Sequence, residues 1–275
     1  MSTGFALTVI SNLILTGCVT MPSQTRDLIY GDSAFQVQAT ECRAKSESKK
    51  SLIILPPTGG TNLIDRSYIK RFCNGGYDVY LLNDWSRPDK SNDLAFHQRE
   101  YTNSQRAIAL TLARIKTPFV GLLGTSVGAT HAAVAANTFE QLDAVMFIVG
   151  GVPIPQVIVT SDHPSMKALH KSRFERFKFE NDAAYESALN NAFALEPTRL
   201  GDIHLKKDFA AVIALSDSTV PVETQKNLVE FFKPQKVITL PNSHFWAILK
   251  TWLSHTKEIV AFFDESSARK INSKP

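Results

Sequence analysis

The sequence predicts an α/β fold: a doubly wound, mostly parallel sheet with a small inserted helical cap. Apolar runs without alternation, such as residues 51–55 and 144–149, are typical of strands buried on both faces. Segments with helical spacing of apolar residues, such as residues 62–74, separate these runs, as in a parallel sheet covered by helices. The run 119–123 leads into Gly-Thr-Ser-Val-Gly at residues 124–128 and then into an alanine-rich segment, which predicts a strand, a sharp turn and a helix.

The other elements follow from their local patterns. Residues 28–30 and 35–39 predict two short strands, and the Gly31-Asp32 pair between them predicts a hairpin turn. The remaining predicted strands are residues 51–55, 77–82, 119–123, 144–149, 209–215 and 236–240, and the predicted helices are residues 62–74, 100–115, 129–136, 223–232 and 245–263.

A charged, helix-forming stretch interrupts this alternation between the strands 144–149 and 209–215. We interpret residues 152–207 as the cap, inserted into one α/β domain that covers residues 28–265. Residues 266–275 are polar and are predicted to form a frayed tail.

The N-terminal stretch predicts a targeting signal. Residues 1–17 contain no charged side chain, and their apolar part ends in Leu15-Thr16-Gly17-Cys18. This pattern resembles a bacterial lipoprotein signal peptide, and the resemblance implies that Cys18 is lipidated. The protein would then be anchored on the periplasmic side of the cell envelope, with residues 18–27 as a tether. The alternative is a cytoplasmic enzyme whose translation starts at Met21.

Composition limits the other classes of function. The chain has 275 residues, 44% of them hydrophobic, and a net charge of +4, which is ordinary for a globular protein. Its densest basic stretch, residues 45–50, is interleaved with serines and reads as a solvated loop, so no nucleic-acid partner is predicted. The three cysteines are not arranged with histidines at metal-ligand spacing, so no metal or other cofactor is predicted. Pairing of Cys42 with Cys73 stays open, as does the oligomeric state.

Three residues form a candidate catalytic constellation. Ser126 lies at the apex of the predicted turn, and a serine hydroxyl needs a general base and a group that orients this base. The strand 209–215 runs into Asp217, and the strand 236–240 runs into His244. Because parallel strands end at the same edge of a sheet, we expect His244 to act as base and Asp217 to orient it.

A serine nucleophile also needs backbone N–H groups that bind the developing oxyanion. We expect one from Val127, directly after Ser126. The other is expected from Gly59, in the glycine-containing loop that follows the strand 51–55.

Taken together, residues 28–263 resemble an α/β-hydrolase. Residues 124–128 match the nucleophile elbow of this superfamily, Asp217 with Val220-Pro221 matches its acid loop, and His244 matches its histidine loop. The resemblance implies a carboxylesterase-like or lipase-like serine hydrolase that acts on a small-molecule acyl substrate through an acyl-enzyme, without a cofactor. Many members carry His-Gly in the oxyanion loop where this chain has Pro-Thr-Gly-Gly. The same triad serves peptidases, thioesterases and acyltransferases, and a catalytically silent lipoprotein that binds ligands is the alternative from another class.

Six further residues lie near the predicted strand ends or are aromatic or histidine side chains of interest, and each has its own interpretation. Asp84 also ends a predicted strand and is an alternative acid. His131 is interpreted as a core residue, and His163 as part of a polar surface loop. Three aromatic residues are predicted to be core, with a role in an acyl pocket as the alternative: Trp85, Phe245 and Trp246.

Overall fold

The computed structural model of the chain describes residues 20–87, 92–200 and 206–273. The predicted signal peptide at residues 1–17 and the predicted lipidation site Cys18 lie outside these described residues. No helix within the described ranges combines the length and the apolar character needed to cross a membrane.

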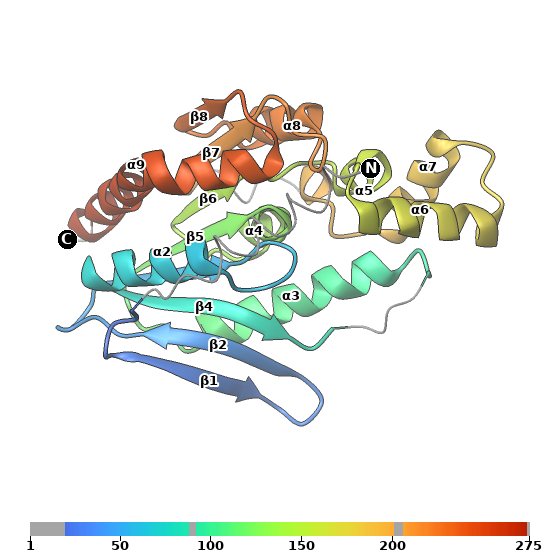
Figure 1. Cartoon of the computed structure of the whole chain (residues 1–275). Coiled ribbons are helices and arrows are strands. Elements are labelled where there is room, and N and C mark those ends of the chain that lie inside the picture. Colours follow the sequence, from blue (N-terminus) through green and yellow to red (C-terminus); the bar gives the residue numbers. More distant parts are fainter. Residues whose placement is uncertain (1–19, 88–91, 201–205, 274–275) are drawn as a thin grey trace.

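The fold is built on an eight-stranded sheet with the order β1-β2-β4-β3-β5-β6-β7-β8. The pairs β1–β2 and β2–β4 are antiparallel, and every pair from β4–β3 to β7–β8 is parallel, which confirms the predicted fold class (Figure 1). The strands are β1 (Thr25–Gly31), β2 (Gln36–Cys42), β3 (Lys50–Leu55), β4 (Tyr77–Trp85), β5 (Phe119–Thr125), β6 (Ala144–Ile148), β7 (Asp208–Ala214) and β8 (Lys236–Leu240).

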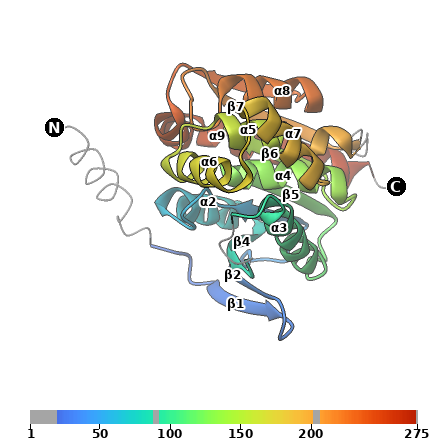
Figure 2. The same ribbon diagram turned by 90° about the vertical axis from the view of Figure 1, so that its right-hand side faces the viewer.

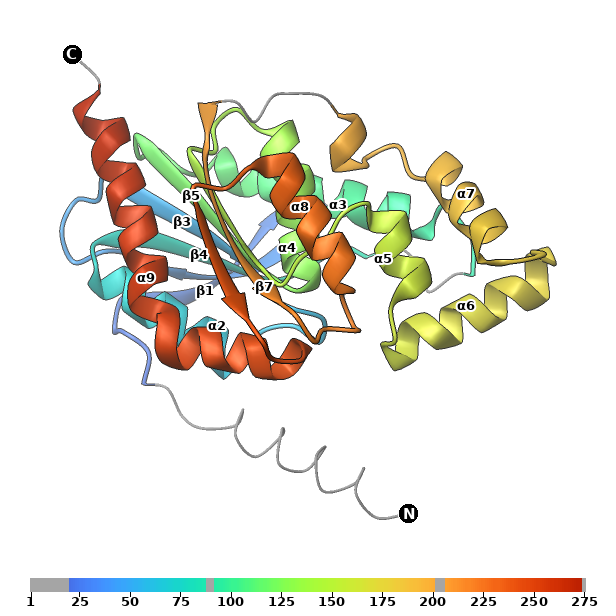
Figure 3. The ribbon, with the colours of Figure 1, turned by 90° about the horizontal axis from the view of Figure 1, so that it is seen from above.

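Helices cover both faces of the sheet, as buried apolar strands require. One face packs against α2 and α9, and the other packs against α3, α4 and α8 (Figure 3). These helices are α2 (Leu63–Asn74), α3 (Phe96–Leu112), α4 (Val127–Thr138), α8 (Val222–Phe232) and α9 (His244–Asn272).

Local interactions start α2 and hold it against the sheet. Asn62 caps α2, since its side chain accepts hydrogen bonds from the N–H groups of Ile64 and Asp65, and Asp65 in turn accepts from the Asn62 N–H. Cys42 at the end of β2 and Cys73 in the last turn of α2 form a disulfide with an S–S distance of 2.04 Å. The sequence left this pairing open, and the structure shows that it joins α2 covalently to the sheet.

The N-terminal hairpin starts earlier than expected. In its turn, Asp32 Oδ1 accepts hydrogen bonds from the N–H groups of Ala34 and Phe35. β1 begins at Thr25 and pairs along its length with β2, so the part of the expected tether after Gln24 belongs to the sheet.

The C-terminal helix extends further than the sequence pattern suggested. α9 continues beyond residue 263 to Asn272, so the prediction of a frayed tail was wrong for its described part. The small side chains of Ser266 and Ser267 are buried. The last turns are also held by ion pairs, Arg269 with Asp208 and Lys270 with Asp143. Buried serines and ion pairs leave no apolar periodicity in the sequence, so the pattern does not predict this extension.

The segment between β6 and β7 forms the cap, which lies beyond the carboxyl ends of the parallel strands (Figures 1 and 2). Its helices are α5 (Ile154–Thr160), α6 (Pro164–Phe177), α7 (Asp182–Ala192) and the 3-10 turn η1 (Pro197–Arg199). Arg173 of α6 is fully buried and donates hydrogen bonds to the Tyr185 hydroxyl and to the Asp93 carbonyl, which holds the cap against the loop before α3.

Candidate active site

Ser126 stands between β5 and α4 in a strained backbone conformation. Its φ of 55° and ψ of −121° lie in a region that L-residues rarely occupy. The Ser126 N–H donates to the Ile148 carbonyl at 2.8 Å, and the Ser126 carbonyl accepts from the N–H groups of Ala129 and Thr130. These bonds tie the turn to β6 and to α4, so the surrounding structure holds the strain.

The two glycines of the turn are required by close packing. A Cβ on Gly124 would lie 2.4 Å from the Gly128 carbonyl oxygen, and a Cβ on Gly128 would lie 2.3 Å from the Leu55 carbonyl oxygen. Both obstacles are backbone atoms, which cannot rotate away. The first turn of α4 therefore lies directly against the end of β3.

The Gly128→Ala variant is expected to lower the free energy of unfolding by about 3 kcal/mol, because overpacking must displace the backbone of β3. Urea unfolding followed by circular dichroism measures this loss. The exposed position Ser254 on α9 provides the control, since Ser254→Ala should change stability by less than about 0.5 kcal/mol. Equal unfolding midpoints for the two variants would contradict the close contact.

The carboxyl ends of three strands bring the candidate catalytic side chains together. Ser126 Oγ lies 2.9 Å from His244 Nε2, and His244 Nδ1 lies 2.6 Å from Asp217 Oδ2. His244 is the first residue of α9, directly after the loop that follows β8, and Asp217 lies in the loop between β7 and α8. The distances are those of a hydrogen-bonded chain from hydroxyl to imidazole to carboxylate.

Asp217 is held by a set of hydrogen bonds that sequence reasoning missed. Its Oδ1 accepts from the N–H groups of Thr219 and Val220, and its Oδ2 accepts from Gln225 Nε2 at 2.9 Å. Gln225 is fully buried, and its Oε1 accepts from the Ala214 N–H at the end of β7. The sequence signal for this role is weak, because the buried face of α8 carries two polar residues, Thr224 and Gln225, beside Leu228 and Phe232.

The two backbone amides expected to bind an oxyanion are available for a ligand. Within the described residues, neither the Val127 N–H nor the Gly59 N–H donates a hydrogen bond. Gly59 has a φ of 97°, and the space where its Cβ would lie is open. Because the Leu55 and Pro56 carbonyls contact the first turn of α4, the loop that carries Gly59 starts beside the nucleophile elbow.

Two other candidates lie away from the hydroxyl–imidazole–carboxylate chain. The carboxylate of Asp84 accepts hydrogen bonds from its near neighbours, the Trp85 N–H and Arg87 Nε, and its side chain is half exposed. His163 caps α6 by accepting a hydrogen bond from the Ser165 N–H. The structure therefore gives both residues local structural contacts and brings neither of them to His244.

The preceding residue, Asp162, has a connecting role that the sequence did not indicate. Its carboxylate accepts hydrogen bonds from the hydroxyls of Ser218 and Thr219, and its N–H donates to the Ser218 carbonyl. These bonds fasten the cap to the loop that carries Asp217.

The aromatic candidates divide into buried and exposed residues. Trp85 is 6% exposed and packs edge-on against the His131 ring, so its predicted core position is confirmed. Trp246 is 49% exposed, so its predicted core position was wrong. Phe245 is partly buried and contacts Trp246. The first turn of α9 thus presents an indole to solvent two residues after His244.

His131 is a buried residue of α4. Its Nδ1 lies 2.8 Å from Ser104 Oγ, and its ring lies 4.1 Å from the Tyr101 ring. Burial lowers the pKa of His131 to about 4, because the charged imidazolium loses its solvation. The folded protein therefore keeps this imidazole neutral.

The lowered pKa of His131 predicts how the free energy of unfolding depends on pH. A histidine with a pKa of about 4 in the folded state and roughly 6.5 in the unfolded state contributes full stability above pH 6.5 and loses it as the pH falls towards 4. From pH 7 to pH 4, the wild type is expected to lose about 3 kcal/mol more unfolding free energy than the His131→Gln variant. Urea titrations of both proteins at the two pH values measure the difference. Equal losses of unfolding free energy in the wild type and in His131→Gln would show that folding does not lower the pKa of His131.

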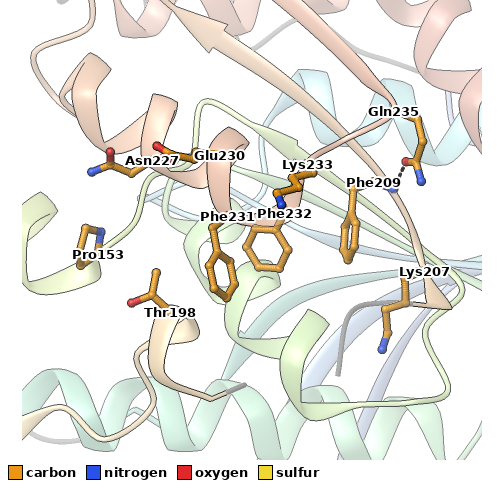
Figure 4. A pocket seen from close by; sticks show the side chains of 10 residues that line it. All are labelled: Pro153, Thr198, Lys207, Phe209, Asn227, Glu230, Phe231, Phe232, Lys233 and Gln235. Atoms are coloured by element: carbon orange, nitrogen blue, oxygen red, sulfur yellow. Dashed lines mark hydrogen bonds between the residues drawn. The ribbon is translucent and has the colours of Figure 1, made fainter. Parts of the chain in front are cut away.

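A pocket of about 860 Å³ lies elsewhere on the molecule (Figure 4). It is lined by the amino end of β7, including Phe209, and by the last turn of α8, including Phe231 and Phe232. Asp217 follows the opposite, carboxyl end of β7. None of Ser126, Asp217 and His244 lines this pocket, so it is separate from the candidate catalytic side chains.

Comparison with known families is consistent with this geometry. Residues 23–255 match the model of the family described as Serine hydrolase (FSH1). No curated protein sequence matches the chain.

Solved structures share the fold at low sequence identity. Acetyl xylan esterase 1 from Thermoanaerobacterium sp. JW/SL YS485 is 13% identical, with a TM-score of 0.67 over 92% of this chain and 87% of the esterase. The α/β-hydrolase GrgF from Penicillium sp. sh18 is 15% identical, with a TM-score of 0.62 over 89% and 99% of the two chains. The acylaminoacyl peptidase of Pyrococcus horikoshii is 14% identical, with a TM-score of 0.66 over 92% of this chain but 43% of the peptidase. These similarities establish an α/β-hydrolase fold.

Proposed function

Because the chain belongs to the FSH1 family of serine hydrolases, we propose that it cleaves an ester or a related acyl bond through a covalent acyl-enzyme on Ser126. The observation that carries this proposal is the continuous chain of contacts from Ser126 Oγ through His244 to Asp217. In this arrangement, a weak nucleophile acquires a base, and the base acquires an orienting carboxylate.

In the first half of the proposed reaction, Ser126 Oγ attacks the acyl carbon while His244 Nε2 takes the hydroxyl proton. Asp217 holds the other ring nitrogen, Nδ1, in its protonated form and stabilises the imidazolium. The carbonyl oxygen becomes an oxyanion that the Val127 and Gly59 N–H groups bind, and the amino end of α4 adds its favourable dipole. The tetrahedral intermediate then collapses, the bond to the leaving group breaks, and His244 protonates that group.

In the second half, a water molecule replaces the alcohol. His244 takes a proton from the water as it attacks the acyl-enzyme, and returns that proton to Ser126 Oγ when the acid leaves. The reaction thus consumes one water and regenerates the hydroxyl and the neutral imidazole. Water is therefore a co-substrate, and the nucleophile, the base and the oxyanion donors all come from the polypeptide.

Gln225 serves in this scheme as a positioning residue for Asp217. The Gln225→Leu variant is expected to lower kcat about tenfold with little change in KM, because Asp217 Oδ2 loses a donor while the substrate contacts remain. Steady-state kinetics on folded protein measure the split between kcat and KM. Lys226→Leu, on the exposed side of the same helix, should leave both constants unchanged. An unchanged kcat in folded Gln225→Leu would remove Gln225 from the scheme.

The bond type is tested with paired substrates. Short-chain p-nitrophenyl esters and an N-acyl amino acid p-nitroanilide both release a coloured nitroaromatic product. They differ in the bond that is cleaved, an ester bond or an amide bond. Hydrolysis of the esters without measurable hydrolysis of the anilide supports an esterase. Substantial hydrolysis of the anilide would instead favour a peptidase on the same fold.

We also propose that the protein is lipid-anchored at Cys18 and faces the periplasm. The match of residues 15–18 to a lipobox supports this proposal. The Cys42–Cys73 disulfide is consistent with it, because disulfides persist in oxidising compartments. In cells, the wild type should fractionate with membranes and carry an acylated Cys18, whereas Cys18→Ser should lose the acyl group. An intact unmodified chain that starts at Met21 would support the cytoplasmic alternative.

A further inference from the structure

Helices α2 and α9 lie side by side on one face of the sheet (Figure 3), where Trp252 Nε1 donates a hydrogen bond to Ser67 Oγ at 2.9 Å. Their outward surface, which we call the α2–α9 face, combines exposed basic and apolar side chains. It consists of Arg66, Lys70 and Arg71 on α2 and of Trp246, Lys250, Leu253 and Lys257 on α9.

The α9 residues of this face form one continuous stripe. They recur at intervals of four, three and four positions, which places them on one side of a helix. Ala247, Thr251 and Ile259 are buried on the opposite side. Trp246 is 49% exposed and Leu253 is 66% exposed. A half-exposed tryptophan and an exposed leucine in line with two lysines form an amphipathic surface of the kind that binds lipid headgroups and the outer parts of acyl chains.

The positive charge of the α2–α9 face is not neutralised by carboxylates. None of the ion pairs among the described residues involves a basic side chain of this face. On other surfaces, exposed basic residues such as Arg99 and Arg106 pair with aspartates. Glu258 of α9 is turned towards β8, where it pairs with Lys236. Asp65 of α2 is buried. The face is therefore complementary to an anionic surface.

The N-terminal segment reaches the fold on the same side. Met21 is partly buried against the core layer that α2 and α9 cover. If Cys18 carries the lipid, as proposed above, the three Cα-to-Cα steps from Cys18 to Met21 span at most roughly 11 Å. The anchor would thus hold this side of the domain close to the bilayer, and this step of the argument rests on the proposed lipidation.

From these observations we propose that the α2–α9 face docks on a bilayer of anionic phospholipid. Trp246 and Leu253 enter the interfacial region, and the lysines and arginines contact lipid phosphates. Because His244 and Trp246 belong to the same first turn of α9, docking holds the turn that carries the proposed catalytic histidine close to the membrane surface, although the two side chains point to different sides of the helix. Acyl substrates that partition into the bilayer would then be concentrated beside Ser126.

The test uses the chain from residue 18 onward, as it would stand after removal of the proposed signal peptide, with Cys18→Ser, so that neither the signal peptide nor a lipid contributes to binding. Sedimentation is measured with vesicles of phosphatidylglycerol and phosphatidylcholine, and with phosphatidylcholine alone. Partitioning to the anionic vesicles should weaken about fivefold for each lysine removed in Lys250→Gln/Lys257→Gln. The matched control is Lys167→Gln/Lys171→Gln on α6, which removes the same charge from another exposed helix and should leave partitioning unchanged.

A second matched pair tests the apolar contribution. Leu253→Glu should weaken partitioning, whereas Ile29→Glu should not, although Ile29 on β1 is 67% exposed and equally apolar. The proposal would be overturned if the variants of the α2–α9 face partitioned to anionic vesicles as strongly as their control variants. It would also be overturned if the Cys18→Ser protein showed no preference for anionic vesicles. Fluorophosphonate labelling of the same samples tests the hydrolase site separately. A chain that binds vesicles but does not label would refute the proposed reaction and leave the docking face intact.

Discussion

Ser126→Ala is expected to lower kcat for ester hydrolysis about 10⁶-fold, the loss typical of removing the nucleophile of a serine hydrolase. The reason is chemical, because alanine has no atom that can form the acyl-enzyme. Folding should be retained, since the bonds that hold this turn come from the Ser126 backbone N–H and carbonyl. Initial rates on a p-nitrophenyl ester, with circular dichroism of the same samples, measure the effect.

Ser243→Ala is the matched control for this experiment. Ser243 directly precedes His244, and its side chain makes no capping hydrogen bond to α9. The control should therefore retain nearly full activity. A folded Ser126→Ala variant with more than about a thousandth of the wild-type kcat would show that another group carries the reaction, since removing a nucleophile costs far more.

Asp217→Asn is expected to lower kcat about 10⁴-fold while the fold persists. The side-chain amide can donate to His244 Nδ1, which favours the tautomer with a proton on Nε2. In that tautomer, His244 cannot accept the proton of Ser126. The contacts from the Thr219 and Val220 N–H groups can be kept, because an amide oxygen accepts them as a carboxylate does.

The control for this variant is Asp84→Asn, which removes the alternative acid suggested by the sequence. Asp84 contacts Arg87 at the half-exposed end of β4, so its variant should lose less than about threefold in kcat, as expected of a surface substitution. Measurement of kcat and KM for both variants on one ester separates the two assignments. A large loss in Asp84→Asn together with a small loss in Asp217→Asn would reverse them.

The positions of Asp217 and His244 at one edge of the sheet follow from simple topology. Each comes directly after a buried strand, and parallel strands end at the same edge. The sequence therefore indicated which side chains to compare, although their catalytic roles stay predictions. It could not give the environment of Asp217, because the Gln225 contact depends on how α8 packs against β7.

Other differences from the sequence-based expectations have the same origin in tertiary contacts. The extension of α9 depends on ion pairs with Asp208 and Asp143, which lie far away in the sequence. The exposure of Trp246 depends on which side of α9 faces the sheet, and hydrophobicity alone predicted the opposite. The Cys42–Cys73 disulfide required knowing that α2 ends beside β2.

The most direct test of the proposed reaction is fluorophosphonate labelling followed by peptide mapping. A fluorophosphonate captures an activated serine by forming a phosphorus–oxygen bond and releasing fluoride. We expect one adduct on the wild type, on the peptide that contains Ser126, with none in Ser126→Ala and a greatly slowed reaction in His244→Ala. Folded wild-type protein that fails to label, or that labels at another residue, would contradict the assignment of Ser126 as the nucleophile.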